Sequence, residues 1–253
     1  MKSRTVIRYC AILAVVAISF VLSSCGSGYQ EIPFGGMKGR VQKVTVIHKE
    51  PEMWHGNRAY SDVMSMEASA YDINGNEICS AQMDSVGRVL GEAESLFDKG
   101  VCIRSTQKSG NRVIARLNLL SNNKRILEYN KEVLGNAVRM VVKKSSFGRR
   151  HKTVVIEDGK TVTISIIKTD RNGYPIKVKE RNPQTGFEAY QFNVYDKDYN
   201  LIEKHITTSD EEKEEIIYTK FTEFDEKGNW IKARTANRNH LPVENLERVI
   251  EYW

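Results

Sequence analysis

The chain has 253 residues and a formal net charge of +6. Its length suits one large domain or two small ones. Three of the positive charges, Lys2, Arg4 and Arg8, fall in the first 24 residues, which hold no acid, so the remainder falls from +6 to +3. This excess is too small to indicate nucleic-acid binding, and we expect no nucleic-acid partner.

The N-terminus has the order of a secretory signal. A basic start is followed by an apolar run from Tyr9 to Leu22, shorter than the about 20 residues that span a bilayer. The tetrapeptide Leu22-Ser23-Ser24-Cys25 resembles the bacterial lipobox. The resemblance implies that residues 1–24 are a lipoprotein signal peptide and that Cys25 is acylated. With Gly26 next, it also implies an outer-membrane destination and leaves the periplasmic or surface face open.

Residues 25–37 contain several glycines and are predicted to be a flexible tether. Residues 38–253 are predicted to form a single β-rich domain, because no linker divides them. Its first strand is expected in "GRVQKVTVIHKE", followed by a longer loop, "PEMWHGNRAYSDV". The clearest hairpin is "VVIEDGKTVTISIIKTD", whereas residues 122–134 fit either a short helix or two strands.

One turn recurs along the chain. An Asp is followed three residues later by Gly, and six residues later by Ile or Leu. Asp side chains accept bonds from nearby backbone amides, and Gly tolerates the left-handed conformation that ends a three-residue hairpin loop. The residue before the Asp should then pair with the residue five after it, as Tyr71 with Glu77 and Phe224 with Trp230. The turn residues are Asp72 and Gly75, Asp84 and Gly87, Asp170 and Gly173, and Asp225 and Gly228.

The repeated hairpins predict a mainly β protein. We expect an antiparallel meander of roughly a dozen to sixteen strands that curls into an open sheet, a half-barrel or a sandwich. A fifth copy of the turn, "YDKDYNLI", has Tyr199 in place of Gly and is expected to be the least regular.

The copies "YDINGNEI" and "FDEKGNWI" resemble the YD repeat of Rhs-type proteins, which is also found in lipoproteins of Bacteroidetes-like bacteria. "DSVGRVL", "TDRNGYPI" and "YDKDYNLI" carry the motif in part. Rhs proteins use long arrays of this repeat to enclose a cargo. The mature chain is too short for that, so the cargo function is not carried over.

The sequence contains few candidates for chemistry. No histidine has zinc-ligand spacing, and "DKDYN" lacks the later Gly and Glu of a calcium loop, so we expect neither a metal nor another cofactor. Glu92 and Glu94 could serve a hydrolase, but adjacent acids on one strand face are usually solvated. In an oxidising compartment Cys79 and Cys102 could form a disulfide or remain buried thiols; the sequence leaves both open.

The sequence therefore favours a non-enzymatic, membrane-anchored lipoprotein of the cell envelope that acts as a binding or scaffold module. Its partner would be a glycan, peptidoglycan or an envelope protein, and the alternative is an envelope hydrolase. The basic run from Lys143 to Lys152 is either an anion-binding segment or a soluble hairpin tip. Exposed aromatic side chains suit sugar stacking, and the candidates are Trp54, Trp230 and Trp253.

Overall fold

The structure is a computed structural model. It describes residues 37–253 except 52, 56–57, 124 and 210–214, and over residues 53–55 and 58–60 it describes the backbone alone. Cys25, the signal peptide and all of the tether before Met37 lie outside the described residues.

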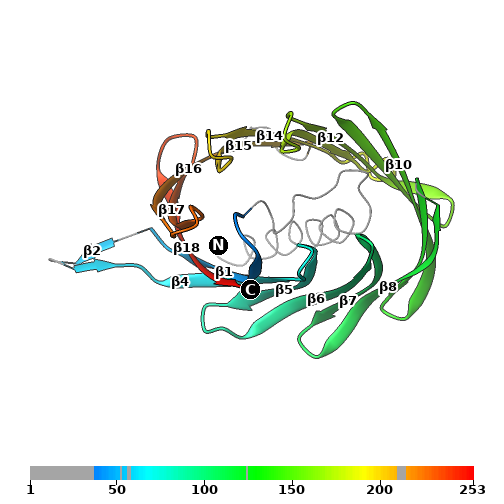
Figure 1. Ribbon diagram of the computed structural model, residues 1–253, viewed down its shortest axis with the longest axis horizontal. Coiled ribbons are helices and arrows are strands. Elements are labelled where there is room, and N and C mark those ends of the chain that lie inside the picture. Colours follow the sequence, from blue (N-terminus) through cyan, green and yellow to red (C-terminus); the bar gives the residue numbers. More distant parts are fainter. Residues whose placement is uncertain (1–36, 52, 56–57, 124, 210–214) are drawn as a thin grey trace.

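The described residues form sixteen strands closed into one antiparallel barrel (Figure 1). Each strand pairs with its neighbours along the chain, and β1 (Val41–Lys49) pairs with both β4 (Val63–Tyr71) and β18 (Pro242–Tyr252). The other barrel strands are β5 (Glu77–Asp84), β6 (Val89–Asp98), β7 (Val101–Ser109), β8 (Arg112–Asn123), β9 (Ile126–Val133), β10 (Asn136–Phe147), β11 (Arg150–Glu157), β12 (Lys160–Thr169), β13 (Pro175–Arg181), β14 (Glu188–Tyr195), β15 (Leu201–Thr208), β16 (Glu215–Phe224) and β17 (Trp230–Ala236).

The predicted β class and meander are confirmed, but the open sheet, half-barrel and sandwich are wrong. The β1–β18 pair closes the sheet, and no local pattern encodes a pairing between residues about 200 positions apart. Residues 122–134 belong to β8 and β9 rather than to a helix. The loop after β1 contains a small hairpin of its own, β2 (Met53–His55) with β3 (Arg58–Tyr60).

The repeated turns share one geometry. In the first, the Asp72 carboxylate accepts bonds from the amides of Asn74 and Asn76, both at 2.9 Å, and Gly75 has a φ of 85°. Matching bonds form at Asp84, Asp170, Asp196 and Asp225. The carboxylate thus supplies acceptors to amides that the tight loop leaves outside the sheet ladder.

The register expected beside these turns is observed. Tyr71 pairs with Glu77, and Phe224 pairs with Trp230. In each copy the next pair skips one residue, and the skipped residue is the recurring Ile or Leu, as at Ile78 between Glu77 and Cys79. The constant apolar position of the repeat is therefore the extra residue of a β-bulge, a feature that increases the local strand twist.

Two further turns extend the pattern. Tyr199 adopts a φ of 65° in the glycine position, and its ring stacks on Tyr174 with centroids 4.4 Å apart. The stacking offsets the cost of a left-handed non-glycine residue. A sixth copy has neither the Asp nor the Gly of the motif: it starts at Asn237 and has His240 in the glycine position at a φ of 58°.

The described buried strand residues all face the same side of the wall when the register is followed from strand to strand. The barrel is a flattened oval in cross-section, with β8 to β10 at one bend and β16 to β18 at the other (Figure 1). Each bend holds one hydrophobic cluster, centred on Tyr129 and Met140 in one case and on Val44 and Tyr71 in the other. In a single-layer barrel only the inner face can be covered by the rest of the wall, so the buried face is the interior.

The seam between β18 and β1 is fastened by one turn residue. The side chain of Asn229, 4% exposed, accepts a bond from the Lys38 amide at 2.7 Å and donates to the Lys38 carbonyl at 2.9 Å. It also donates to the Tyr252 hydroxyl at 2.7 Å, and that hydroxyl donates to Asp225. The turn beside β17 therefore binds both the first and the last segments of the barrel.

We predict that Asn229→Ala lowers the free energy of unfolding by about 1–3 kcal/mol, because it removes two bonds to the Lys38 backbone and one to the Tyr252 hydroxyl. Urea denaturation followed by circular dichroism measures the change. Asn76→Ala is the matched control, since the Asn76 side chain bonds only within its own turn, to Asp72. Equal losses in the two variants would contradict the role of Asn229 at the seam.

Candidate functional site: a cationic and aromatic cradle on the outer wall

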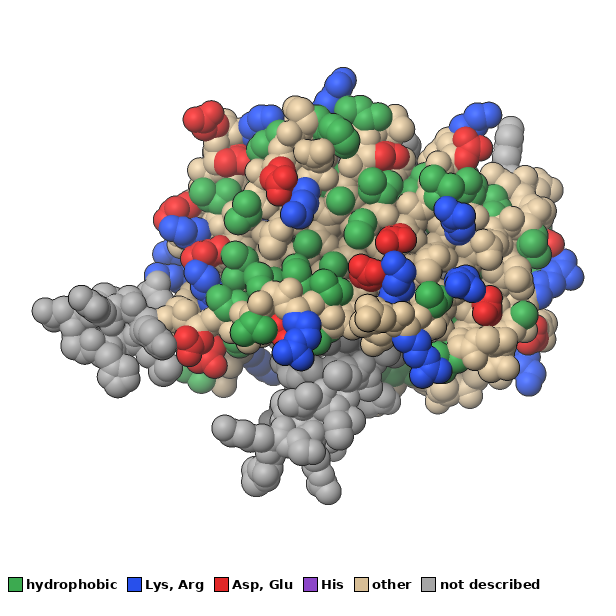
Figure 2. All heavy atoms as spheres, turned by 90° about the horizontal axis from the view of Figure 1, so that it is seen from below, with side chains coloured by type: hydrophobic (Ala, Val, Ile, Leu, Met, Phe, Trp, Pro, Cys, Tyr) green, Lys and Arg blue, Asp and Glu red, His purple; other side chains and the backbone are tan. Residues whose placement is uncertain are grey.

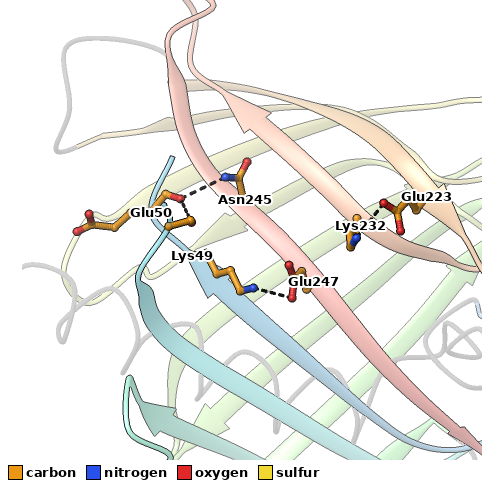
Figure 3. A network of polar contacts seen from close by, with 7 residues as sticks. Lys49, Glu50, Glu223, Lys232, Asn245 and Glu247 are labelled. Atoms are coloured by element: carbon orange, nitrogen blue, oxygen red, sulfur yellow. Dashed lines mark hydrogen bonds and ion pairs between the residues drawn. The ribbon is translucent and has the colours of Figure 1, made fainter. Parts of the chain in front are cut away.

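Charged side chains cover the outer wall. Most stand opposite a side chain of the other sign on the next strand, with nitrogen–oxygen distances of 2.7–3.8 Å. Figure 3 shows two of these pairs, Lys49 with Glu247 and Lys232 with Glu223. In Figure 2, positively and negatively charged side chains are scattered among apolar ones on the face seen from below. The pairs are Lys43 with Glu251, Lys49 with Glu247, Lys108 with Glu92 and Glu94, Arg116 with Glu132, Arg139 with Glu128, and Lys232 with Glu223.

This surface differs from that of a membrane-spanning barrel. Such barrels turn an apolar band about 25 Å tall towards lipid and place polar residues inside. Here ion pairs lie on the outer wall and the described apolar clusters lie inside, where inward side chains such as Lys131 and Glu157 form an ion pair of their own. The outer wall therefore carries charged pairs where a membrane-spanning barrel has an apolar band.

One region of the wall departs from the pairing of opposite charges. Arg150 on β11 stands directly opposite Lys168 on β12, which stands opposite Lys177 on β13. Like charges in such positions repel each other. Among the described residues, no carboxylate lies within 4.0 Å of the charged nitrogens of these three side chains. The neighbouring residues Thr169 and Asn193 are buried, so the alternation turns the cations outwards.

Two aromatic rings continue these cross-strand rows. Phe192 on β14 stands opposite Lys177, whose Nζ is 5.6 Å from the ring centroid. In the next row, Tyr190 stands opposite Lys179, whose Nζ is 4.6 Å from the ring centroid and 2.5 Å from the hydroxyl. His205 on β15 meets Phe192 edge-on, with centroids 5.8 Å apart. The site thus combines ammonium groups with exposed ring faces.

These side chains line a hollow of about 480 Å³ on the outer wall, within the size range of small-molecule sites. We call this site the cradle. It is lined by Arg150, Ile166, Lys168, Lys177, Val178, Lys179, Tyr190, Gln191, Phe192, His205 and Thr207.

Glu188 sets the polarity of one edge of the cradle. Its carboxylate accepts from the Tyr190 hydroxyl at 2.8 Å and contacts Lys179 Nζ at 3.5 Å. The hydroxyl bond, followed by the attraction of Lys179, lowers the pKa of Glu188. The bond with Tyr190 in turn raises the pKa of Lys179. At this edge the charge of Glu188 balances the charge of Lys179. The net positive charge of the cradle is therefore concentrated at Arg150, Lys168 and Lys177.

The basic run predicted between Lys143 and Lys152 contributes only part of the site. Arg150 lines the cradle and Lys152 follows in the next outward row, whereas His151 points inwards and bonds Ser146 at 3.0 Å. The sequence analysis missed Lys168, Lys177, Lys179, Tyr190 and Phe192. Alternation along the strands could have identified them. In "KVK" (177–179) the two lysines point to one face of the strand, and in "YQF" (190–192) the two aromatic rings do the same.

The other candidate residues do not form a second site. Glu92 and Glu94 are bridged by Lys108, at 2.8 and 3.1 Å. Trp230 faces inwards, with Arg248 stacked on its ring at 3.5 Å, while Trp253 is exposed at the C-terminus and the Trp54 side chain lies outside the described residues. Within residues 37–253, less the gaps, no group of three or more His, Cys, Asp or Glu could hold a metal ion.

The two cysteines are not joined in the structure. Cys102 points into the barrel on β7, and its Sγ lies 3.4 Å from the Arg104 carbonyl. Cys79 on β5 pairs with Ala70 and Glu94 in the outward rows. Side chains on opposite faces of the wall cannot meet, so the structure does not support the disulfide alternative.

No family model matches the sequence, and no curated protein matches it. The chain is similar to a porin-like protein from Bacteroides uniformis ATCC 8492, with a TM-score of 0.50 and 10% identity over 85% of this chain and 99% of that chain. A porin-like protein from Bacteroides vulgatus ATCC 8482 has a TM-score of 0.42 and 9% identity, over 84% and 98%. At 10% identity the first likeness shows a shared fold alone, that of a closed antiparallel barrel. No helix in the described part of the chain is long and apolar enough to cross a membrane.

We predict that Lys168→Glu raises the free energy of unfolding by about 0.2–1 kcal/mol, because it inserts a negative charge between Arg150 and Lys177. Lys108→Glu, next to Glu92 and Glu94, should lower it by a similar amount. Urea titrations at low ionic strength compare the two. Destabilisation by both substitutions would show that the cradle cations already have compensating partners.

Proposed function

We propose that this protein is a lipid-anchored, non-enzymatic binding module of the cell envelope that uses the cradle to bind an anionic glycan. The observation that carries the proposal is the row formed by Arg150, Lys168 and Lys177, in which cations face one another without described acidic partners. The row lowers stability unless an anion is bound, and such a cost is typical of binding sites.

The aromatic rings favour a carbohydrate over a small inorganic anion. Tyr190 and Phe192 are 45% and 41% exposed and lie on neighbouring outward rows of the same strand. Ring faces of this kind pack against the apolar faces of sugars, while the adjacent ammonium groups pair with carboxylate or phosphate substituents. An acidic polysaccharide or the glycan of an envelope polymer satisfies both requirements.

The proposed location combines the lipobox with the character of the outer wall. Acylation at Cys25 would attach the protein to a membrane, with the outer membrane implied by Gly26. The ion pairs on the wall indicate that the barrel itself stands in water beside that membrane. The fold shared with a porin-like protein therefore need not bring a pore function with it.

The hydrolase alternative has less support. A glycosidase needs two carboxyl groups about 5–10 Å apart at the substrate, one of them with a raised pKa. The acid beside the cradle, Glu188, has a lowered pKa and is bound by Tyr190 and Lys179. The proposal is therefore binding without catalysis.

Replacing both Lys168 and Lys177 by Gln should weaken binding to an acidic polysaccharide such as polygalacturonate by more than tenfold, since each charge-assisted contact contributes about 1.5–3 kcal/mol. Isothermal titration with the Cys25→Ser mature chain measures this. The control variant Lys43→Gln with Lys232→Gln removes the same charge from ion-paired positions and should bind normally.

Ring contacts can be tested separately. Tyr190→Ala with Phe192→Ala should weaken binding to the polysaccharide and leave binding to inorganic polyphosphate nearly unchanged. A tenfold loss with the control lysine variant as well would indicate general charge attraction, and the proposed site would be rejected.

We predict that the unaltered chain incorporates labelled palmitate at Cys25 and that the Cys25→Ala chain does not. The mature barrel without acyl chains should remain monodisperse in buffer without detergent, because its outer wall is charged. Palmitate labelling and light scattering provide the measurements. An unaltered chain that incorporates no palmitate would refute the anchor.

A further inference from the structure

The two ends of the barrel are chemically different. Because all neighbouring strands are antiparallel, successive connections alternate between the ends. One end carries the start of β1 at Val41, the end of β18 at Tyr252, and the β10–β11, β14–β15 and β16–β17 turns. We call it the terminal rim. The other end, the opposite rim, carries the β5–β6, β9–β10 and β17–β18 turns.

Exposed aromatic side chains gather at the terminal rim. Six aromatic residues in the described part of the chain are strongly exposed, and two of these, Tyr190 and Phe192, belong to the cradle. The other four all lie at the terminal rim: Phe147, Tyr199, Phe224 and Trp253. The opposite rim presents aliphatic tips instead, such as Val86 and Leu134. Aromatic side chains are enriched where proteins meet the membrane–water interface.

Phe147 is the most exposed of the four, at 89%. It stands at the tip of the β10–β11 hairpin, where Gly148 turns the chain with a φ of 56°, and it pairs with Arg150. Arg149 follows in the same turn, so a protruding ring is flanked by two guanidinium groups. In the β9–β10 turn, Leu134 lies within the two-residue loop at a φ of 50°, and the flanking pair, Val133 and Asn136, is uncharged.

The aspartates of the repeated turns at this rim bond within their own turns and do not pair with the basic tip. Asp72, Asp170, Asp196 and Asp225 each direct a carboxylate oxygen back to amides of their own turns. The guanidinium groups of Arg149 and Arg150 have no carboxylate within 4.0 Å among the described residues. Guanidinium groups form bidentate pairs with phosphate, so the tip is suited to phosphorylated headgroups.

The described part of the chain also begins at this end, where the Lys38 amide bonds the side chain of Asn229 in the β16–β17 turn. The segment from Cys25 to Met37 covers 12 residue steps, which span at most about 40 Å when fully extended. If Cys25 is acylated, as in the proposed function on which this step rests, the terminal rim is the end held near the bilayer.

We propose that the terminal rim docks on an anionic phospholipid surface, with Phe147 and Trp253 entering the headgroup region and Arg149 and Arg150 binding phosphates. The barrel then stands on the membrane by one end. The cradle, whose row begins at Arg150 just behind the tip, faces sideways close to the membrane.

The test uses the mature chain with Cys25→Ser, so that binding does not depend on acylation. Its sedimentation with vesicles of phosphatidylcholine containing phosphatidylglycerol is compared with sedimentation on phosphatidylcholine alone. We expect binding that requires the anionic lipid. Phe147→Ser with Trp253→Ser should reduce the partition coefficient at least tenfold. Arg149→Gln with Arg150→Gln should reduce it about fivefold per charge.

The matched control is Val86→Ser with Leu134→Ser, which removes two exposed apolar tips from the opposite rim. It should bind vesicles like the parent, and thermal unfolding should show that all variants are folded. No binding to anionic vesicles, or equal losses for the two rims, overturns the proposal. Polysaccharide titration and palmitate labelling are independent of this outcome, so a failure here is distinguishable from a failure of the proposed function.

Discussion

The pairing of β1 with β18 is the constraint on which the rest of the structure depends. It turns a meander with two exposed edges into a barrel with none, which removes the unpaired backbone groups that invite aggregation. Closure also defines an inside and an outside. Only then do the two apolar clusters become interior, and only then does the alternation along each strand give the outer wall its charges. The contacts of Asn229 with Lys38 and Tyr252 lie at this seam, where a turn serves a long-range role.

The local structure could be predicted from the sequence because its determinants are local. An Asp that bonds its own turn and a Gly with positive φ fix the hairpin and the register beside it, as Tyr71 with Glu77 shows. Closure could not be predicted, since the seam joins the two ends of the chain. The cradle could not be predicted for a related reason: Arg150, Lys168 and Lys177 are ordinary surface cations until the register places them side by side. The pattern becomes visible only when neighbouring strands are aligned in register, because no single strand contains all three cations.

The likeness to a porin-like protein concerns how the strands are connected and closed. The ion pairs of the outer wall concern the surroundings that this surface suits. A backbone of this kind can serve either environment, because exchanging the inward and outward residues of each strand leaves the hydrogen-bond ladder unchanged. Ion pairs such as Arg139 with Glu128 are each weak in water, but their joint presence would be costly in lipid.

The seam has the geometry of a hairpin without a turn. The Trp253 amide donates to the Arg40 carbonyl at 3.0 Å, and Tyr252 pairs with Val41, so the two ends of the barrel wall are neighbours on one rim. A short linker could join them, and the chain could then be opened at another exposed turn, such as the one at Gly110, without changing any strand pair. In this respect the strand pairing does not require any particular strand to come first. The observed order decides only that β1 and β18 lie next to the segment that precedes Met37.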